Sequence, residues 1–406
     1  MAVIKSLLDT DLYKLTMQAV VVEKYSDADV QYLLTNRSSD KKLSREAAEW
    51  IKQEINALGQ LHFTPEEISY LRKTLPYLPS RYYEFLETCR LDPQSQVKVE
   101  MEADLKIVVE GPWKVTILYE IPILAIVSEA YFKFVDTDWS YDGQLELAKS
   151  KAQQLASTGC AFSEFGTRRR RSVEAQELVI QGIVDAQIGS LLIGTSNVYF
   201  AQKYNLRPIG TVAHELMMGI ASYSGDVKGA NKLAMDAWLD TVGSDHAGFA
   251  LTDTFGTRAF LDSFVKPYSD YYLGVRQDSG DPVEYTKVIG EHYRKLGYAA
   301  NTKHILYSDS LNIERCIEYK QAAQAEGLIP SFGVGTFFTN DFLTLSGHAS
   351  KPLNIVMKIY SINGVPCVKL SDNIGKNMGD ATAIQQAKER LGYTVTTAGP
   401  NEAERW

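Results

Sequence analysis

From about Gly143 to Phe338 the chain repeats one pattern, a short apolar or glycine-bearing run that ends in a cluster of polar residues. Seven runs end in SEFGTRRRR (163–171), LLIGTSN (191–197), PIGTVAHE (208–215), FALTDTFGT (249–257), GVRQDSGD (274–281), ILYSDSLN (305–312) and FGVGTFF (332–338). When one glycine, threonine or aspartate is taken from each polar cluster, such as Gly166 and Gly194, consecutive clusters lie 17 to 42 residues apart. This spacing suits repeated strand–helix units. The pattern predicts a parallel βα array, either closed into a barrel or open as a doubly wound sheet.

The segments outside this pattern predict a mixture of helices and strands. Apolar spacing predicts helices at 44–58, 65–75 and 119–134, and alternation predicts strands within 97–110. Late in the chain, Asn363-Gly364 between two apolar runs predicts a two-residue hairpin turn.

These patterns suggest two domains. We expect an N-terminal α+β domain at residues 1–140, joined by a C-terminal hairpin and helix at 350–406. We expect the α/β-barrel domain at residues 141–349, where the repeated runs occur.

Charge and composition argue against several classes of protein. The 406 residues include 50 acidic and 42 basic side chains, a net charge of −8, which argues against nucleic-acid binding. The four cysteines are scattered without a CxxC pair, which is typical of reduced thiols inside the cell. The most apolar stretch, 115–134, contains Glu120, Pro122 and Glu129, so we expect no membrane span. The early acids Asp9 and Asp11 disfavour a secretory or mitochondrial leader, and we expect a soluble intracellular protein.

Two motifs are suited to binding anions. Arg168–Arg171 follow Glu164-Phe165-Gly166 at a predicted strand end, where guanidinium groups grip phosphate or carboxylate; we expect at most one or two to face a site. The glycines of Gly333-Val334-Gly335-Thr336 let backbone N–H groups approach an anion, and barrel phosphate sites often use the last loops.

Carboxylates follow two other predicted strands. Asp278 and Asp309 are suited to binding Mg²⁺ or sugar hydroxyls, whereas we expect Asp281 and Ser310 to cap helices.

One histidine also stands at a predicted strand end. A lone histidine such as His214 is usually structural, and the alternative is a nucleophile or proton carrier. Asp253 either orients a partner or caps a helix. The six histidines include no close pair, so we expect no His-rich metal site. Together the anion motifs, the carboxylates and the histidine predict a phosphorylated sugar substrate.

A family resemblance takes the interpretation further. In order along the chain, LLDTDLYKLTM, EFGTRRRRS, GTSN, GTVAHE, LTDTF, GVRQDSGDPVEYTK, YSDSLN and FGVGT resemble the motifs of nicotinate phosphoribosyltransferases. The resemblance runs from Ser6 to the closing NEAERW. It implies a type II phosphoribosyltransferase fold, an irregular α/β barrel with a second domain. It also implies an ATP-coupled transfer of phosphoribosyl from 5-phosphoribosyl-1-pyrophosphate to nicotinate, giving nicotinate mononucleotide and pyrophosphate in NAD biosynthesis.

The resemblance implies roles at the pyridine and at the phosphate. Tyr13 and Phe165 sandwich the pyridine ring, because flat aromatic faces stack on it. Arg168 assists at the ring or at a phosphate. Gly335 and Thr336 cradle the 5′-phosphate.

It also implies a catalytic set. His214 is phosphorylated by ATP, and Arg276 holds the nicotinate carboxylate. Asp278 and Asp309 position the ribose, directly or through Mg²⁺ bound with the diphosphate, and Thr211 hydrogen-bonds the substrate. We expect positioning and charge stabilisation, and we assign no general base.

Ser196 bears on the choice of substrate. Related nicotinamide-using enzymes have an aspartate in the segment that resembles Gly194-Thr195-Ser196-Asn197. That aspartate accepts a hydrogen bond from the amide and repels a carboxylate, so the serine predicts nicotinate over nicotinamide.

Several alternatives remain open at this stage. Nicotinamide or quinolinate is the alternative pyridine, a barrel glycosidase would use Glu164 and Asp253 as paired carboxylates, and a sugar-phosphate sensor would bind without turnover. We expect a cytoplasmic protein with nuclear presence open, and no nucleic-acid or membrane partner. The sequence itself does not reveal the oligomeric state; the resemblance implies a homodimer in which the Tyr13 segment reaches the partner's site.

Overall fold

The computed structural model describes residues 2–38, 40–373 and 376–393. The end of the predicted C-terminal segment, with the NEAERW sequence, therefore lies outside the described residues. Two compact units are found: unit 1 is Met1–Gly210 with Val334–Lys358, and unit 2 is Thr211–Gly333 with Ile359–Trp406. The domain boundaries expected at residues 140 and 350 follow changes of sequence pattern rather than contacts, and they stay a prediction.

Unit 1 contains an antiparallel sheet and most of the helices. Its helices are α1 (Leu12–Lys24), α2 (Arg45–Ala57), α3 (Pro65–Thr74), α4 (Ser80–Thr88), α5 (Pro93–Gln96), α6 (Trp113–Thr116), α7 (Glu120–Phe134), α8 (Gln144–Ser157), α9 (Val173–Asp185), α10 (Val198–Lys203) and α17 (Thr336–Thr339). Its strands are β1 (Asp29–Asn36), β2 (Val97–Met101), β3 (Leu105–Pro112), β4 (Phe162–Glu164), β5 (Leu192–Thr195), β10 (Phe342–Leu343) and β11 (Ala349–Ser350).

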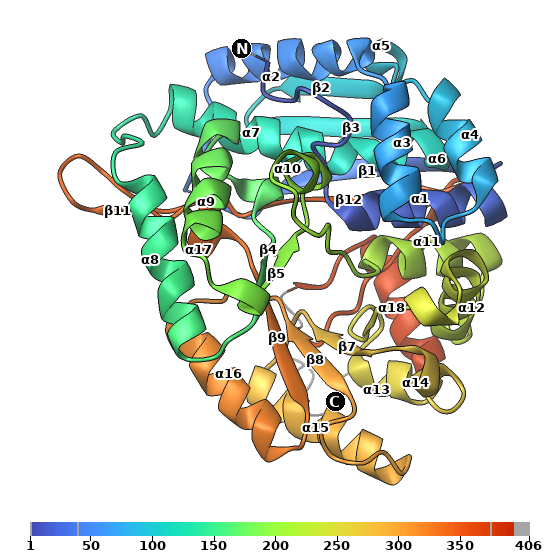
Figure 1. Ribbon diagram of the computed structural model, residues 1–406. Helices are drawn as coiled ribbons and strands as arrows, with labels where there is room; N and C mark the ends of the chain where they lie inside the picture. The colour runs from blue at the N-terminus through green and yellow to red at the C-terminus, as the bar shows by residue number, and fades with distance from the viewer. Residues whose placement is uncertain (1, 39, 374–375, 394–406) are drawn as a thin grey trace. The chain divides into compact units, whose positions relative to one another are not determined.

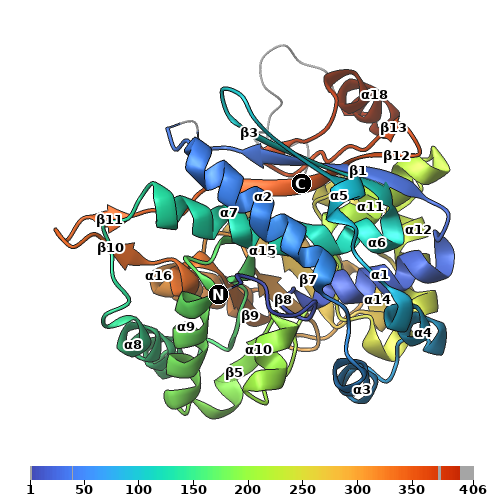
Figure 2. The ribbon, with the colours of Figure 1, turned by 90° about the horizontal axis from the view of Figure 1, so that it is seen from above.

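The strands expected within 97–110 form a hairpin of β2 and β3, and β1 pairs with the other edge of β3. Helix α2 begins after Ser44, whose side chain accepts a hydrogen bond from Ala47 N, and buries Ile51 and Ile55. Figure 2 shows α2 running beside α7 next to this sheet. The helices expected at 44–58 and 65–75 are thus confirmed within one residue at each end.

The apolar segment around α7 forms part of the core of unit 1. By length and composition, the helical run Trp113–Phe134 is long and apolar enough to cross a membrane, but 89% of its most apolar window is buried inside the protein. A buried helix of this kind is typical of a protein core.

In unit 1 the strands expected at SEFGTRRRR and LLIGTSN form and pair in parallel, whereas the run PIGTVAHE does not form a strand. Strand β4 pairs in parallel with β5, and helix α9 lies between them in sequence. The prediction of a strand at PIGTVAHE is wrong, because this run makes a single bridge, between Pro208 and Thr195. Proline has no N–H with which to extend a ladder.

Unit 2 carries the longer parallel array. Its helices are α11 (His214–Ser224), α12 (Ala230–Val242), α13 (Thr257–Leu261), α14 (Tyr268–Tyr271), α15 (Pro282–Lys295), α16 (Ile313–Ala325) and α18 (Ala381–Leu391). Strands β6 (Phe249–Leu251), β7 (Gly274–Gln277) and β8 (His304–Tyr307) lie within it, and β13 (Val365–Pro366) follows later. The chain passes between the units inside β9 (Ile329–Val334) and inside β12 (Ile355–Ile362).

Strands β6, β7, β8 and β9 pair in parallel in that order. Figure 1 shows β7, β8 and β9 together, with α15 and α16 toward the lower edge of that view. Because the strands are parallel, their carboxyl ends lie at one edge of the sheet. This edge carries the polar clusters that follow β6, β7 and β8 in the sequence.

The predicted hairpin turn at Asn363-Gly364 is confirmed. Strands β12 and β13 pair through Ile362 and Val365, and the two residues between them have φ values of 48° and 76°. Two consecutive positive φ angles define the turn type that favours Asn-Gly.

Candidate active site

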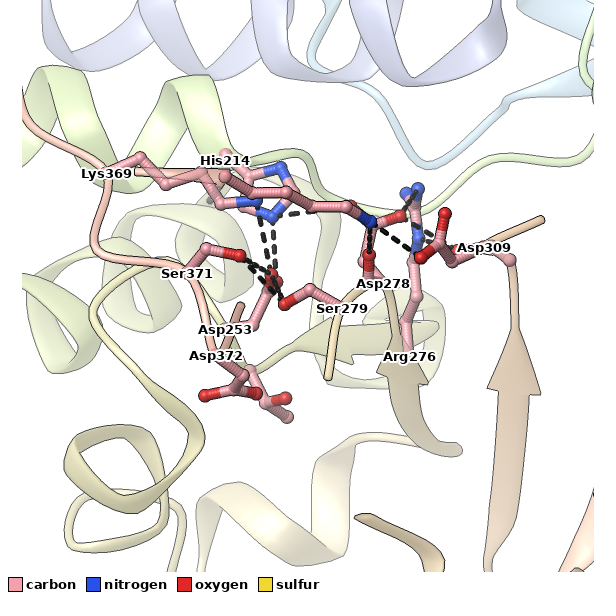
Figure 3. Close-up of polar contacts among 12 residues, drawn as sticks. His214, Asp253, Arg276, Asp278, Ser279, Asp309, Lys369, Ser371 and Asp372 are labelled. Carbon is pink, nitrogen blue, oxygen red and sulfur yellow. Dashed lines mark hydrogen bonds and ion pairs between the residues drawn. The ribbon is translucent and has the colours of Figure 1, made fainter. Parts of the chain in front are cut away.

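Three loops at the carboxyl edge of the unit 2 sheet place polar side chains together. Asp253 follows β6, Asp278 and Ser279 follow β7, and Asp309 follows β8. Leu251 is in register with Arg276, and Gln277 with Tyr307, so these loops begin at similar heights. Figure 3 shows their side chains pointing toward one another. The structure therefore brings these predicted residues together at one edge of the sheet, and their role in a site stays a prediction.

His214 begins helix α11 and is buried against this edge. Its Nε2 lies 2.7 Å from Asp253 Oδ1 and 3.6 Å from Asp278 Oδ2. Burial and nearby Lys369 lower the pKa of His214 to about 4, even though both carboxylates act in the opposite direction. A neutral imidazole next to an ionised carboxylate carries its proton on Nε2, which leaves the Nδ1 lone pair free.

Asp253 stays ionised although it is buried. Burial alone raises its pKa, but Lys369 and His214 together hold that pKa well below the usual range. Lys369 Nζ lies 3.2 Å from Asp253 Oδ2, and the Ser279 hydroxyl donates to the same oxygen at 2.6 Å. Of the two interpretations of Asp253, the structure supports the one in which it orients a partner.

Arg276 is fixed by three partners around its guanidinium. It donates to Ser308 Oγ at 2.8 Å, to Thr211 Oγ1 at 2.9 Å and to Asp278 Oδ1 at 2.7 Å. Burial opposes ionisation of Asp278, yet Arg276 and His214 lower its pKa. Arg276, Thr211 and Asp278, all expected in the site, therefore form one connected group.

Asp309 has a different partner from Asp278. Lys376 Nζ lies 2.6 Å from Asp309 Oδ2. Within the described ranges, His214, Asp253 and Asp278 form a group whose ligand atoms all lie within 4.8 Å of one another. Carboxylate oxygens suit Mg²⁺, so the donor set around Asp278 fits such an ion. That Mg²⁺ binds at this position stays a prediction.

The two capping expectations have different outcomes. The Asp281 side chain accepts hydrogen bonds from Val283 N and Glu284 N and caps α15, as expected. The expectation for Ser310 is wrong, because Asn312 caps α16. Ser310 has a φ of 52° and its hydroxyl lies 3.1 Å from Asp309 Oδ1.

Unit 1 brings together the residues expected around the pyridine. Ser196 N donates to Glu164 O, next to half-buried Phe165, and Leu12 N, next to half-buried Tyr13, donates to Ser196 O. The backbone of Ser196 thus connects the two segments that carry the expected ring-binding side chains. The stacking role of Tyr13 and Phe165 stays a prediction.

The Ser196 hydroxyl has a partner that the sequence analysis missed. It donates to Asp11 Oδ1 at 2.7 Å. Asp11 is buried, and burial raises its pKa while Arg168 acts against this shift. A carboxyl group therefore lies next to Ser196, although the residue at 196 is uncharged.

The glycine loop packs tightly against the Phe165 segment. A Cβ at Gly166 would come within 2.2 Å of Thr339 Oγ1, and one at Gly335 within 3.2 Å of Phe165 O. Helix α17, which follows Gly335, has only four residues. The dipole of α17 is therefore smaller than that of a full-length helix and offers less attraction to an anion at Gly335.

The four consecutive arginines have different surroundings. Arg170 forms a bidentate pair with Asp9, with both N–O distances 2.8 Å. Arg171 stacks 3.6 Å from the Phe132 ring centre and donates to Ser350 O. Both are buried, whereas Arg168 is partly exposed, with its Nη1 4.0 Å from Glu120 Oε1. Arg170 and Arg171 are therefore held by contacts inside the protein, and the expectation that at most one or two of the four arginines face a site stays a prediction.

Comparisons with known proteins agree with this arrangement. The N-terminal domain of the nicotinate phosphoribosyltransferase (NAPRTase) family matches residues 8–128, and the NAPRTase family matches residues 160–395. A nicotinate phosphoribosyltransferase of Saccharomyces cerevisiae is 54% identical over 100% of this chain and 99% of its own. The chain belongs to the nicotinate phosphoribosyltransferase family.

Other nicotinate phosphoribosyltransferases extend the comparison. One from Methanosarcina mazei is 40% identical over 96% of this chain and 98% of its own. A crystal structure described as that of a putative nicotinate phosphoribosyltransferase from S. cerevisiae is 54% identical and matches with a TM-score of 0.95 over 97% of this chain and 99% of that one. A Porphyromonas gingivalis structure, 35% identical, gives 0.89 over 96% and 100%. These likenesses confirm the expected type II phosphoribosyltransferase fold.

In this member of the nicotinate phosphoribosyltransferase family, sequence reasoning missed residues of the candidate site that come from distant segments. Lys369 and Ser371 follow the C-terminal hairpin, and the Ser371 hydroxyl contacts Ser279 Oγ at 2.9 Å. No motif marked them. Asp11 and Lys14 lie inside the motif LLDTDLYKLTM. The charged residues of that motif were therefore the signal by which the sequence could have revealed them.

Proposed function

We propose that this chain transfers the phosphoribosyl group of 5-phosphoribosyl-1-pyrophosphate to nicotinate, in a reaction coupled to ATP hydrolysis through phosphorylated His214. The products are nicotinate mononucleotide and pyrophosphate, and the pathway served is NAD biosynthesis. Family membership supports the transfer. The buried, neutral His214 held by Asp253 supports the ATP step.

The geometry of His214 suits it as a phosphoryl acceptor. Its Nδ1 attacks the γ-phosphorus of ATP, the bond from that phosphorus to the bridging oxygen breaks, and ADP leaves. The Nε2 proton remains hydrogen-bonded to Asp253, whose carboxylate stabilises the charge that forms on the ring. Attack of water on phosphorus later breaks the N–P bond and releases phosphate.

The transfer step itself needs positioning more than acid–base chemistry. The pyridine nitrogen bonds to C1 of the ribose as the bond from C1 to the pyrophosphate oxygen breaks. Arg276, held by Thr211, Ser308 and Asp278, is oriented for a carboxylate or a phosphate oxygen. Mg²⁺, when bound with the diphosphate, neutralises the negative charge on the leaving group. We propose Asp278, with Asp309, to hold that ion.

Labelling with ATP that carries a radioactive γ-phosphate tests the ATP step. We expect acid-labile label on the parent protein and none on His214→Ala. His246→Ala, which removes an exposed histidine of the same unit, should keep the label. Asp253→Asn keeps the shape of the side chain but removes its charge, and should slow labelling by about tenfold or more. Equal labelling of His214→Ala and the parent would refute the assignment.

A further inference from the structure

The two oxygens of the Asp253 carboxylate are held by different groups of unit 2. Oδ1 lies 2.7 Å from His214 Nε2. Oδ2 accepts a hydrogen bond from the Ser279 hydroxyl at 2.6 Å and lies 3.2 Å from Lys369 Nζ. The Ser371 hydroxyl lies 3.4 Å from Oδ2 and 2.9 Å from Ser279 Oγ. One oxygen therefore faces the histidine, while the lysine and the two serines surround the other (Figure 3).

The backbone around Lys369 is fixed within unit 2. Leu370 N donates to Thr254 O at 2.7 Å, and Thr254 directly follows Asp253 in the loop after β6. Lys369 exchanges two backbone hydrogen bonds with Met378, at 2.9 and 3.0 Å. Because the main chain is held at these points, the side chain of Lys369 reaches Asp253 from a defined position.

Lys369 and Asp253 form a buried ion pair, with 6% and 1% of their side chains exposed. Such a pair is costly to form, because both charges leave water, and it needs additional hydrogen bonds to offset that cost. The hydroxyls of Ser279 and Ser371 supply them at Oδ2. A pair of this kind contributes little to stability, so its presence beside His214 calls for another explanation.

The orientation of the Asp253 carboxylate decides which nitrogen of His214 is free. A turn of the carboxylate about its Cβ–Cγ bond would take Oδ1 away from His214 Nε2. The same turn would break the contacts of Oδ2 with Lys369 and Ser279. While Oδ1 stays in place it accepts the Nε2 proton, and Nδ1 remains the nitrogen without a proton.

A second buried lysine of unit 2 provides a contrast. Lys303 Nζ donates to Ser269 O at 2.5 Å and to Tyr272 O at 2.7 Å. Buried backbone carbonyls need donors, so these contacts have a structural explanation. Lys369 instead pairs with a side chain that itself contacts His214. The two lysines are equally suited to stabilising the fold, and they differ in their connection to the histidine.

We propose that Lys369 is a positioning residue, which holds the Asp253 carboxylate toward His214 and so leaves His214 Nδ1 free to accept a phosphoryl group. Ser279 and Ser371 complete the hold on Asp253 Oδ2. The inference rests on the proposed function, in which ATP phosphorylates His214. Since Lys369 acts through Asp253, its loss should slow phosphoryl transfer without weakening the binding of ATP.

Single-turnover labelling with radioactive ATP tests this role. Lys369→Met closely matches the length of the side chain and removes its charge. We expect the labelling rate at saturating ATP to fall by about tenfold, while the ATP concentration that gives half this rate stays within about twofold. Lys369→Arg keeps the charge and should label within about threefold of the parent. An unchanged rate in Lys369→Met, or an effect confined to the half-saturating ATP concentration, would overturn the proposal.

Lys303→Met is the matched control. It makes the same substitution at the other buried lysine, whose hydrogen bonds to Ser269 O and Tyr272 O do not involve Asp253. The Lys303→Met variant should label at the rate of the parent. Equal slowing in Lys303→Met and Lys369→Met would mean that loss of any buried lysine disturbs the unit, and it would overturn the proposal.

The Nε2 proton of His214 reports its contact with Asp253 directly. A proton shared between an imidazole and a carboxylate over 2.7 Å gives a downfield signal in proton NMR spectra. We expect this signal in the parent and in Lys369→Arg, and its loss in Lys369→Met, His214→Ala and Asp253→Asn. The parent's signal persisting unchanged in Lys369→Met would overturn the proposal, even for a protein that accepts no phosphoryl group.

A double-mutant cycle tests whether Lys369 acts through Asp253. Residues that act through one another give non-additive effects, so Lys369→Met in the background of Asp253→Asn should slow labelling no further. The double variant removes both charges of the buried pair, so it decides the question even if Lys369→Met alone does not fold. A further fall of about tenfold in the double variant would overturn the proposal. A parent protein without acid-labile label would instead refute the proposed function.

Discussion

At the scale of single residues, the site shows how neighbours decide the charge of a buried group. Asp253 and Glu164 are both buried carboxyl groups near parallel strand ends. Lys369 and His214 keep Asp253 ionised, whereas Glu164 has only neutral hydrogen-bond partners in Thr195, Gly166 and Gln176. Burial accordingly raises the pKa of Glu164 to about 7. The glycosidase alternative needs Glu164 as a reacting acid, but its side chain is enclosed by these partners.

Glu164 should make stability depend on pH. Its folded-state pKa of about 7 lies above the ordinary value of 4.5, so between these values the folded chain holds a proton that the unfolded chain releases. The free energy of unfolding should therefore fall by about 3 kcal/mol as pH rises from about 4.5 to 7. Calorimetry should show a fall over this pH range that is about 3 kcal/mol smaller in Glu164→Gln than in the parent, since Asp372, whose pKa burial also raises to about 7, titrates in both proteins. Glu174→Gln, at an exposed site, should behave like the parent, and an identical pH profile in Glu164→Gln would contradict the account.

The choice of pyridine should also depend on one residue. Ser196→Asp places a carboxylate beside Asp11, where it accepts a hydrogen bond from an amide and repels a carboxylate. We expect the ratio of kcat/KM for nicotinamide over nicotinate to rise by about tenfold or more, since the change is one of charge. Ser196→Ala removes the hydrogen bond to Asp11 without adding charge and should not raise the ratio. An unchanged ratio in Ser196→Asp would refute the role of Ser196.

At the scale of elements, local sequence signals were reliable where a single element carries them. The 65–75 segment forms α3, and Thr64 and Glu67 make the reciprocal hydrogen bonds of a capping box. The Asn363-Gly364 turn was equally local. The prediction of a strand at PIGTVAHE was wrong because strand formation depends on pairing with a neighbouring strand, which the local sequence does not reveal. Lys369 and Lys376 were missed for the same reason, since the path of the chain after the hairpin brings them to the strand ends.

The α3 cap gives a prediction at this scale. Thr64→Ala removes the acceptor for Glu67 N and should lower the free energy of unfolding by about 1 kcal/mol. Denaturant melts should show this loss, while pyrophosphate release stays unchanged. Thr302→Ala, at an exposed position outside any helix, should cost less. Equal stability of Thr64→Ala and the parent would mean that the cap contributes nothing.

At the scale of the whole molecule, the sequence predicted the class of fold because the polar clusters mark strand ends. Parallel strands bring such ends to one edge, and β6, β7 and β8 do so in unit 2. Each of the two units includes a segment from late in the sequence: residues 334–358 belong to unit 1 and residues 359–406 belong to unit 2. The Asn363-Gly364 turn was a local signal for a late hairpin, but the unit against which such a segment packs is set by tertiary contacts. The homodimer and the cytoplasmic location stay predictions.

The most direct measurement of the central claim compares three pyridines as acceptors. Purified protein with ATP, Mg²⁺ and phosphoribosyl pyrophosphate is given nicotinate, nicotinamide or quinolinate, and mononucleotide and pyrophosphate are quantified together. We expect equimolar mononucleotide and pyrophosphate, with the highest kcat/KM for nicotinate. A higher kcat/KM for either other pyridine, or no pyrophosphate with any of the three, would contradict the account.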